Sequence, residues 1–200
     1  MTHLDHGTLA THVANCTPYA WPWNGVLDPR ATAALVVEPA SNGPLRGTGE
    51  AVRALAAMVE VTRAVRDAGG TVIRAVTAPA PMEVVGGERG PLPITSDHEI
   101  ASVGIDGFYG SSLDALLRSR GIERLILVGA GLETCVHSTM RSANDRGFEC
   151  LLVIDACIPF DGALVAPSVS MIEMSGGIFG AVGSAADVVG AFTPVEGNRE

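Results

Sequence analysis

The sequence predicts a single-domain α/β protein built on a doubly wound parallel sheet, with helices on both faces. Three observations predict this fold. Short, continuous apolar runs recur along the chain, as strands buried on both faces require. Helical patterns separate these runs, and parallel strands need such crossovers. The 200 residues, 47% of them hydrophobic, are enough to bury one sizeable core.

The elements follow an N-terminal arm. Residues 1–29 are polar at first and then rich in Pro and Trp, which predicts an irregular arm, and residues 30–195 form the predicted domain. The side chains of Tyr19, Trp21 and Trp23 need an apolar surface to cover them. Either the arm's own domain or a neighbouring subunit can provide that surface.

The first half of the domain alternates strand, helix and strand. Apolar runs predict strands over residues 32–37 and 71–76. The helix between them covers residues 48–68 and ends at a Gly pair. Its expected buried stripe consists of Val52, Leu55, Val59 and Thr62. A loop rich in Pro and Gly over residues 77–97 leads to a short strand over 98–103.

The second half repeats the alternation. The same patterns predict a helix over residues 111–120, strands over 124–128 and 149–154, and a helix over 134–146. Val136, Met140 and Ala143 form the expected buried stripe of that last helix. Two helices, near 163–174 and 184–192, complete the predicted domain.

Composition excludes several classes of protein. The net charge is −9 and no basic cluster interleaves with aromatics, so we expect no binding to nucleic acid. The apolar runs are shorter than the roughly 20 residues of a membrane helix, and the first residues lack the pattern of a signal peptide. The four cysteines are irregularly spaced, unlike a disulfide framework. We therefore expect a cytoplasmic protein with reduced thiols and no membrane contact.

Cys135 lies where a strand gives way to a helix, in Gly129-Ala-Gly-Leu-Glu-Thr-Cys135. The first turn of a helix leaves N–H groups unpaired and carries a partial positive charge, which favours a thiolate. The alternative is that Cys135 is a small buried hydrophobic residue, as most free cysteines are. Its position alone leaves both interpretations open. For Cys150 and Cys157, in or just after a core strand, packing is the expected role, and Cys16 is expected to be incidental.

Several chemically capable residues occur at the ends of predicted strands. Glu38, Cys135 and Asp155 all lie at or just past a carboxyl end, where doubly wound sheets bind their ligands. Asp155 either orients the site or accepts a hydrogen bond at the strand end. The five histidines form no metal-ligand pattern, and the Gly-x-Gly at 129–131 lacks the rest of a dinucleotide fingerprint. We therefore expect neither a metal nor a cofactor.

Four segments together resemble a known family. They are the segment 121–157 around Cys135, the run 17–29 of the arm, Phe108-Tyr-Gly-Ser-Ser-Leu-Asp114, and Gly176-Gly-Ile-Phe-Gly180. They are similar to the isochorismatase-like cysteine hydrolases, which include nicotinamidases and the amidases acting on biuret and ureido compounds. The resemblance covers most of the chain, and the segment around Cys135 is its most specific part.

The resemblance implies covalent catalysis by an activated thiol. In the family an Asp takes the thiol proton, a Lys stabilises charge and backbone N–H groups hold the oxyanion. Here Cys135 matches the nucleophile, Glu38 occupies the Asp position and Ser102 the Lys position. The substrate would be a small molecule with an amide or ureido C–N bond, and the protein a homodimer or homotetramer. The residues implied to bind substrate are Gly131, Thr134, Phe108 and Asn42.

The sequence departs from the family where the lysine is expected. All 13 basic residues are arginine, and a serine cannot supply a lysine's fixed charge. Either a neighbour compensates, with His98, Asp106 and Arg74 as candidates, or hydrolysis is lost. The loop at 39–43 also lacks the family's Met-Gln-Asn-Asp-Phe run. Two functions remain: a cysteine hydrolase, or a non-hydrolytic relative that binds, assembles or serves another step of a pathway.

Overall fold

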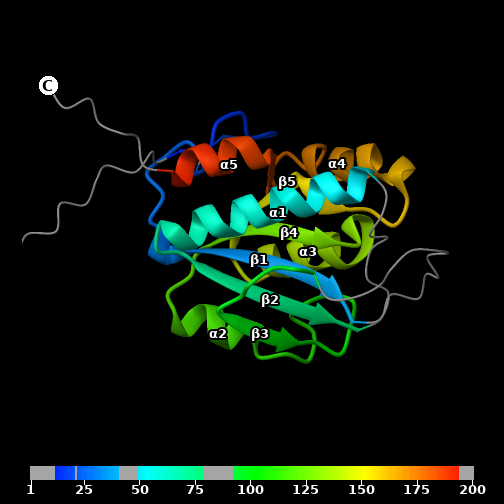
Figure 1. The fold of residues 1–200 in the computed structure, drawn as a ribbon, viewed down its shortest axis with the longest axis horizontal. Coiled ribbons are helices and arrows are strands. Elements are labelled where there is room, and N and C mark those ends of the chain that lie inside the picture. The colour runs from blue at the N-terminus through cyan, green and yellow to red at the C-terminus, as the bar shows by residue number, and fades with distance from the viewer. Residues whose placement is uncertain (1–11, 21, 41–48, 79–91, 194–200) are drawn as a thin grey trace, which may run out of the picture.

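The computed structural model describes residues 12–20, 22–40, 49–78 and 92–193. Within these ranges six parallel strands form one sheet in the order β3-β2-β1-β4-β5-β6, with helices on both faces (Figure 1). The predicted doubly wound α/β fold is thus confirmed. The strand order reverses between β1 and β4, which pair directly although β2 and β3 separate them along the chain.

The boundaries of most elements agree with the sequence patterns to within a few residues. The strands are β1 (Thr32–Pro39), β2 (Thr71–Thr77), β3 (His98–Ala101), β4 (Arg124–Ala130), β5 (Glu149–Ile158) and β6 (Ala181–Gly183). The α-helices are α1 (Gly49–Asp67), α2 (Leu113–Ser119), α3 (His137–Asp145), α4 (Val165–Glu173) and α5 (Ala185–Phe192). Three short helices join them: η1 (Pro29–Ala31) and η3 (Gly162–Leu164) are 3-10 helices, and η2 (Leu132–Val136) is a π-helix.

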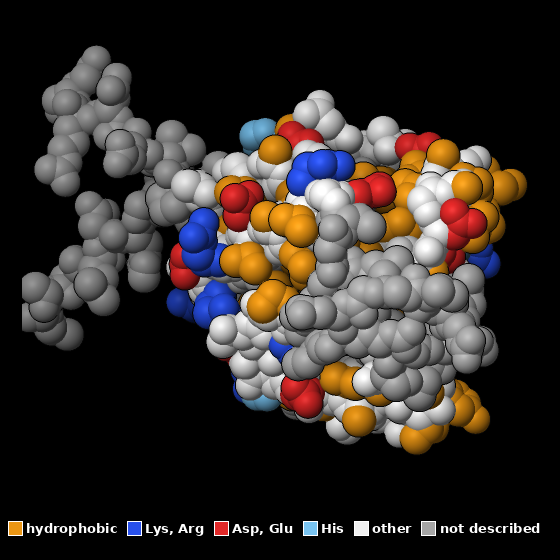
Figure 2. All heavy atoms as spheres, turned by 45° about the vertical axis from the view of Figure 1, so that its right-hand side comes forward, with side chains coloured by type: hydrophobic (Ala, Val, Ile, Leu, Met, Phe, Trp, Pro, Cys, Tyr) orange, Lys and Arg blue, Asp and Glu red, His pale blue; other side chains and the backbone are white. Residues whose placement is uncertain are grey.

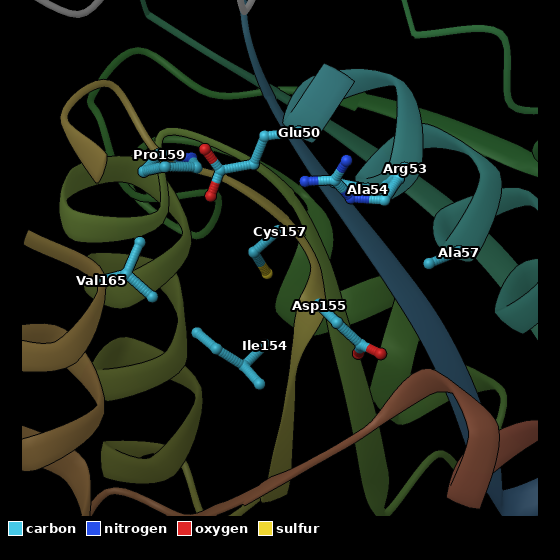
Figure 3. A pocket seen from close by; sticks show the side chains of 9 residues that line it. All are labelled: Glu50, Arg53, Ala54, Ala57, Ile154, Asp155, Cys157, Pro159 and Val165. Atoms are coloured by element: carbon cyan, nitrogen blue, oxygen red, sulfur yellow. The ribbon is translucent and has the colours of Figure 1, made fainter. Parts of the chain in front are cut away.

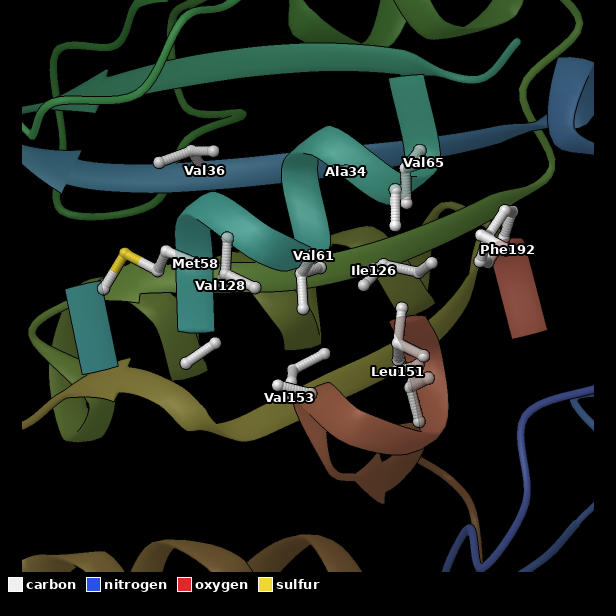
Figure 4. Close-up of a cluster of buried hydrophobic side chains, with 14 of the residues drawn as sticks. Ala34, Val36, Met58, Val61, Val65, Ile126, Val128, Leu151, Val153 and Phe192 are labelled. Atoms are coloured by element: carbon white, nitrogen blue, oxygen red, sulfur yellow. The ribbon is translucent and has the colours of Figure 1, made fainter. Parts of the chain in front are cut away.

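The sheet is buried on both faces, which explains the continuous apolar runs of its strands. Every residue of β1 is buried. Its side chains alternate between the two faces, as pleating requires: Val36 joins the core under α1 and α5, whereas Val37 joins the core under α2, α3 and α4. Figure 4 shows the first of these cores, where Met58, Val61 and Val65 of α1 pack against side chains of β1, β4 and β5.

The second core holds the helix that follows β4. Val136, Met140 and Ala143 are all buried there, which confirms the stripe expected from the sequence. Leu113 and Leu117 of α2 and Ile172 of α4 complete it. Cys135, the candidate nucleophile expected from the sequence, also belongs to this second core.

The prediction of the buried stripe of α1 was wrong, because the buried face lies one residue earlier along the helix than expected. Val52 is 57% exposed and Val59 39% exposed, although Thr62 is buried as expected. The helix carries two apolar stripes, and the one with small residues lets its backbone approach the sheet closely. The face that meets the sheet consists of Ala51, Ala54, Met58, Val61, Thr62, Ala64 and Val65.

The strands at one edge also differ from expectation. β5 continues to Ile158, so Asp155 lies inside the strand rather than past its end. A register shift between β4 and β5 accompanies the longer strand. β6 was not predicted at all, because three residues, Ala181–Gly183, are too few to show a periodic pattern.

The arm packs against its own domain. Thr17 forms an antiparallel bridge with Val182 of β6, and Asn15 donates a hydrogen bond from Nδ2 to Asp187 of α5. Trp23 is fully buried, and Tyr19 donates a hydrogen bond from its hydroxyl to Glu149 of β5. Of the two surfaces considered for the arm, these residues use the domain itself. Trp21 lies outside the described residues.

Exposed hydrophobic side chains occur near the carboxyl ends of the strands. Figure 2 turns these ends toward the viewer and shows hydrophobic side chains on both sides of the residues whose placement is not described. A further set runs from η3 through α4 into the segment before β6 and consists of Leu164, Met171, Met174 and Ile178. In the described part of the chain, no helix has the length and apolar content needed to cross a membrane.

Candidate functional site

The site lies where the order of the sheet reverses. β1 and β4 are neighbours, but the chain leaves β1 toward β2 on one side and β4 toward β5 on the other. Ligands of doubly wound sheets bind beyond the carboxyl ends of the strands at such a point. Glu38 is the penultimate residue of β1, Thr77 ends β2, and Cys135 lies five positions after the last residue of β4. The topology therefore brings these three residues to the same edge.

Two glycines shape the turn that carries Cys135. A Cβ on Gly129 (φ 144°) would lie 2.1 Å from the carbonyl oxygen of Val37, so only glycine allows β4 to approach β1 this closely. Gly131 adopts a left-handed conformation (φ 71°) and starts η2. Its carbonyl oxygen accepts hydrogen bonds from the N–H groups of Thr134 and Val136, both at 3.1 Å. Cys135 therefore lies in a π-turn that begins earlier than the predicted helix start at 134.

The Cys135 sulfur is fully buried and has two hydroxyl groups beside it. Thr77 Oγ1 lies 3.4 Å from Cys135 Sγ, and Thr134 Oγ1 lies 3.7 Å from it. Thr134 was implied to bind substrate; its hydroxyl contacts the Cys135 sulfur, and its role in substrate binding stays a prediction. Thr77 was missed, although its position at the carboxyl end of β2 is the signal that singled out Glu38. The structure thus places hydrogen-bond donors at the sulfur.

Glu38 is held by the segment that leads into β3. Its Oε1 accepts a hydrogen bond from the N–H of Leu92 at 2.8 Å, and its Oε2 lies 3.6 Å from Nη1 of Arg74. Arg74 Nη2 in turn donates to the carbonyl oxygens of Leu92 and Ile94, at 2.8 and 2.6 Å. Strand alternation puts Glu38 and Arg74 on the α1 face, together with Val36. Cys135 belongs to the core on the other face of the sheet, so Glu38 and Cys135 share the carboxyl edge but not a face. A buried cation therefore lies next to the carboxylate that matches the family's base.

The other predicted site residues have plainer surroundings. Ser102, in the family's Lys position, donates its hydroxyl to the carbonyl oxygen of Gly104 at 2.9 Å. Phe108 is buried and stacks on Phe148 with ring centroids 6.0 Å apart. These contacts are those of packing and turn residues, and a role in substrate binding stays a prediction. Asn42 lies outside the described residues.

Among the three candidates for a compensating group, Arg74 alone is described in contact with Glu38. Asp106 accepts hydrogen bonds from the N–H of Phe108 and the hydroxyl of Ser142, so it anchors its own turn to α3. His98 starts β3 and is half-buried. Arg74 is therefore the cation best placed to act near the family's acid position.

Glu133 fixes the cysteine turn to the loop after β5. Its carboxylate accepts hydrogen bonds from the N–H of Phe160, at 3.0 and 3.1 Å, and from the N–H of Asp161 at 2.8 Å. The Phe160 ring lies against Gly131, where an added Cβ would be 2.7 Å from Cε2. The hydrogen bonds of Glu133 hold the backbone of Phe160, and the Phe160 ring packs against Gly131. Glu133 therefore helps to fix the conformation of the cysteine turn.

A cavity of about 400 Å³ lies beside β5 (Figure 3). Asp155 accepts a hydrogen bond there from the N–H of Ala185 at 2.8 Å and so caps α5, the plainer of its two interpretations. Burial raises the pKa of the Cys157 thiol, and a hydrogen bond from the N–H of Gly129 opposes the shift only in part. Cys157 is therefore a neutral thiol at neutral pH. The lining residues are Glu50, Arg53, Ala54, Ala57, Ile154, Asp155, Cys157, Pro159 and Val165.

No cluster of three or more His, Cys, Asp or Glu side chains within the described ranges is arranged to hold a metal ion. His137, two residues after Cys135, is buried and accepts a hydrogen bond at Nδ1 from Nε of Arg141. Burial, and then the charge of Arg141, lower its pKa. His137 is therefore neutral at neutral pH.

The fold and the cysteine turn define a doubly wound α/β protein with a candidate nucleophile at its switch point. A family model described as the isochorismatase domain matches residues 33–187. Since this match spans most of the chain, the protein belongs to the isochorismatase family. The sequence resemblance is thereby confirmed.

Two relatives show the range of similarity. The ureidoacrylate amidohydrolase RutB of Variovorax paradoxus (strain S110) is 33% identical over 103 residues, which are 51% of this chain and 40% of that protein. The uncharacterised isochorismatase family protein YecD of Escherichia coli O157:H7 is 36% identical over 87 residues, 41% of this chain and 46% of that protein. The matches thus span less than half the length of these relatives.

Solved structures show the same fold. A cysteine hydrolase from Pseudomonas syringae pv. phaseolicola 1448A has a TM-score of 0.67 at 19% identity, over 83% of this chain and 94% of that one. The N-carbamoylsarcosine amidase from Thermoplasma acidophilum has a TM-score of 0.59 at 22% identity, over 77% of this chain and 96% of that one. At these identities the similarity concerns the fold.

Proposed function

We propose that this protein is a cysteine hydrolase that cleaves an amide or ureido C–N bond of a small molecule. The observation that carries the proposal is the position of Cys135, in a tight turn at the switch point of the sheet with two hydroxyl groups at its sulfur. Family membership supports a hydrolase. Relatives named ureidoacrylate amidohydrolase and N-carbamoylsarcosine amidase support the substrate class.

The proposed reaction has two stages. Glu38 accepts the proton of the Cys135 thiol, and the thiolate attacks the carbonyl carbon of the substrate. The C–N bond breaks, the nitrogen leaves with the proton from Glu38, and a thioester joins the acyl group to Cys135. Water, deprotonated by Glu38, then attacks the thioester and releases the acid and the free thiol. Backbone N–H groups of the turn at 131–136 would stabilise the oxyanion in both stages.

Arg74 takes the place of the missing lysine in this proposal. Its guanidinium lies 3.6 Å from the carboxylate of Glu38 and is largely buried. An Arg–carboxylate pair orients the carboxylate through fixed donors, whereas a Lys would supply a mobile point charge. Glu38 is also one methylene longer than Asp, so it reaches farther from β1 to compensate for its different anchoring.

A turnover screen tests the function. Wild type is incubated with a panel of small amides, ureas and ureido acids, and release of ammonia or amine is measured. We expect Cys135→Ala to lower turnover by about 10⁴-fold or more, as the loss of a nucleophile does in other triads. Cys150→Ala is the matched control, because Cys150 is a buried thiol in the same core that donates only to carbonyl oxygens. Acid quenching of a reacting sample should trap the acyl group on Cys135.

Two results would contradict the proposal. One is turnover that survives in Cys135→Ala, and the other is a Glu38→Gln variant that turns over as fast as wild type. The second would leave Cys135 as the nucleophile and remove Glu38 from the chemistry.

The competing proposal is a non-hydrolytic relative that binds a small molecule or serves another pathway step. The engagement of Glu38 by Leu92 and Arg74 favours it, because a carboxylate used as an anchor is less available as a base. Thermal-shift binding over the same panel separates the two functions. Binding that persists in Cys135→Ala, with no product from wild type, would select the competitor.

The setting of the protein is also part of the proposal. We propose a cytoplasmic homodimer or homotetramer, with residues 1–29 as an arm and 30–195 as the catalytic domain. The exposed hydrophobic side chains on α4 and after it support self-association. Sedimentation measurements at several concentrations would determine the number of subunits.

A further inference from the structure

We propose that the hydroxyls of Thr77 and Thr134 stabilise the Cys135 thiolate directly and thereby take over part of the charge stabilisation that a lysine would supply. This inference rests on the proposed function, in that it takes Cys135 as the nucleophile. It concerns a different group of atoms, namely the two side chains in hydrogen-bond contact with the sulfur.

Each hydroxyl has a choice of two acceptors. Thr77 Oγ1 lies 3.2 Å from the carbonyl oxygen of Ala78 and 3.4 Å from Cys135 Sγ. Thr134 Oγ1 lies 3.3 Å from the carbonyl oxygen of Gly131 and 3.7 Å from the same sulfur. A hydroxyl carries one proton, so it donates to one acceptor at a time. When the sulfur is ionised, the charge-assisted hydrogen bond is the stronger one and both protons turn to it.

Three of the charged or titratable groups on the surrounding elements interact with partners other than the sulfur. Glu38 interacts with Leu92 and Arg74, and Glu133 accepts its hydrogen bonds from the loop after β5. His137 accepts a hydrogen bond from Arg141. The titratable and charged residues on η2, on the elements that contact it and on β5, which pairs with β4, are Glu38 on β1, Arg74 on β2, Arg124 on β4, Glu133 on η2, His137, Arg141 and Asp145 on α3, Glu149, Cys150, Asp155 and Cys157 on β5, and Glu173 on α4.

The two hydroxyls also suit a buried sulfur. Cys135 is fully buried, and an ion in such a position needs hydrogen bonds to replace the water it loses. Thr77 is itself 1% exposed, so its hydroxyl is fixed in place before any substrate arrives. A donor that is already in position costs no reorganisation when charge develops.

The ultraviolet absorbance of the thiolate measures this effect without any turnover. The signal of Cys135 is the difference between each protein and the same protein carrying Cys135→Ala, followed as a function of pH. Burial raises the pKa of Cys16 to about 11 and also raises the pKa of Cys150 and Cys157 above the ordinary range of a thiol, and the subtraction removes their signals. We expect Thr77→Val and Thr134→Val each to raise the midpoint of the Cys135 signal by about one pH unit.

The matched variants separate the hydroxyl from its surroundings. Thr77→Ser and Thr134→Ser keep a hydroxyl and should keep the wild-type midpoint. Thr139→Val is the control for a general loss of packing, because the Thr139 hydroxyl donates to the backbone oxygen of Cys135 at 2.7 Å and not to its sulfur. Its midpoint should stay at the wild-type value.

The outcomes discriminate between this inference and the proposed function. Midpoints that do not move in Thr77→Val and Thr134→Val overturn the inference, as does an equal rise in Thr139→Val. If Thr77→Val does not fold, the half-buried Thr134 supplies the same comparison at a more tolerant position. A protein that shows the midpoint shifts but no turnover with any substrate would retain the inference and overturn the hydrolase.

Discussion

The ion pair between Arg74 and Glu38 offers a direct measure of how tightly the acid position is anchored. At 3.6 Å, with the two side chains 12% and 6% exposed, the Coulomb attraction is about 5 kcal/mol for an effective dielectric constant of about 20. Desolvation offsets part of it. Arg74→Met also leaves the carbonyl oxygens of Leu92 and Ile94 without this donor. We expect the substitution to lower the free energy of unfolding by about 3–5 kcal/mol.

The chain contains a well-matched control for this change. Arg66 also binds a carboxylate and a carbonyl oxygen of the same segment, those of Asp97 and Thr95, but its side chain is 31% exposed and that of Asp97 is 40% exposed. Solvent screens such a pair, so Arg66→Met should cost about 1 kcal/mol or less. Urea unfolding followed by circular dichroism gives both values under one set of conditions.

A double-mutant cycle then isolates the pair itself. Glu38→Gln keeps an oxygen for the N–H of Leu92 and removes the charge. Combined with Arg74→Met it should show a coupling energy of about 2–3 kcal/mol, near the upper end for residues in contact. The reasoning is refuted if the two changes add within about 0.5 kcal/mol, or if Arg74→Met is no more costly than Arg66→Met.

Two further predictions concern the cysteine turn and the pH dependence of the protein's stability. Gly129→Ala should destabilise the protein by about 3 kcal/mol or more, since it combines a positive φ with overpacking against Val37, and a lower urea midpoint would show it. Gly147→Ala, whose added Cβ would meet nothing within 4 Å, should cost clearly less, and equal costs would contradict the close approach of β4 to β1. The pKa of His137 in the folded state lies below its ordinary value of 6.5. As the pH falls, the unfolded chain therefore binds a proton at His137 before the folded protein does, and the free energy of unfolding decreases below about pH 6.5. Unfolding measured between neutral and acidic pH should therefore show a shallower decline in His137→Gln, and identical slopes would rule out this contribution.

Most of the fold could be predicted because its signals are local. The apolar run of β1 and the helical stripe of α3 each depend on the spacing of residues within one element. The same reasoning from local patterns chose the wrong face of α1, because both of its apolar stripes have helical spacing. It also missed β6, which is too short to show a period. Which stripe of α1 is buried depends on how closely the helix can approach the sheet, and that distance is set by the side chains of the helix and of the sheet together.

The sequence by itself determined that Cys135 stands at a strand-to-helix turn and that Glu38 lies at the carboxyl end of the first strand, because both positions follow from the order of the elements. Only the tertiary structure decided what these groups touch. Thr77 reaches the sulfur across 58 residues and Leu92 reaches the carboxylate across 54. Contacts between residues so far apart in the chain arise when parallel strands end at one edge, and no local pattern records which side chains meet there.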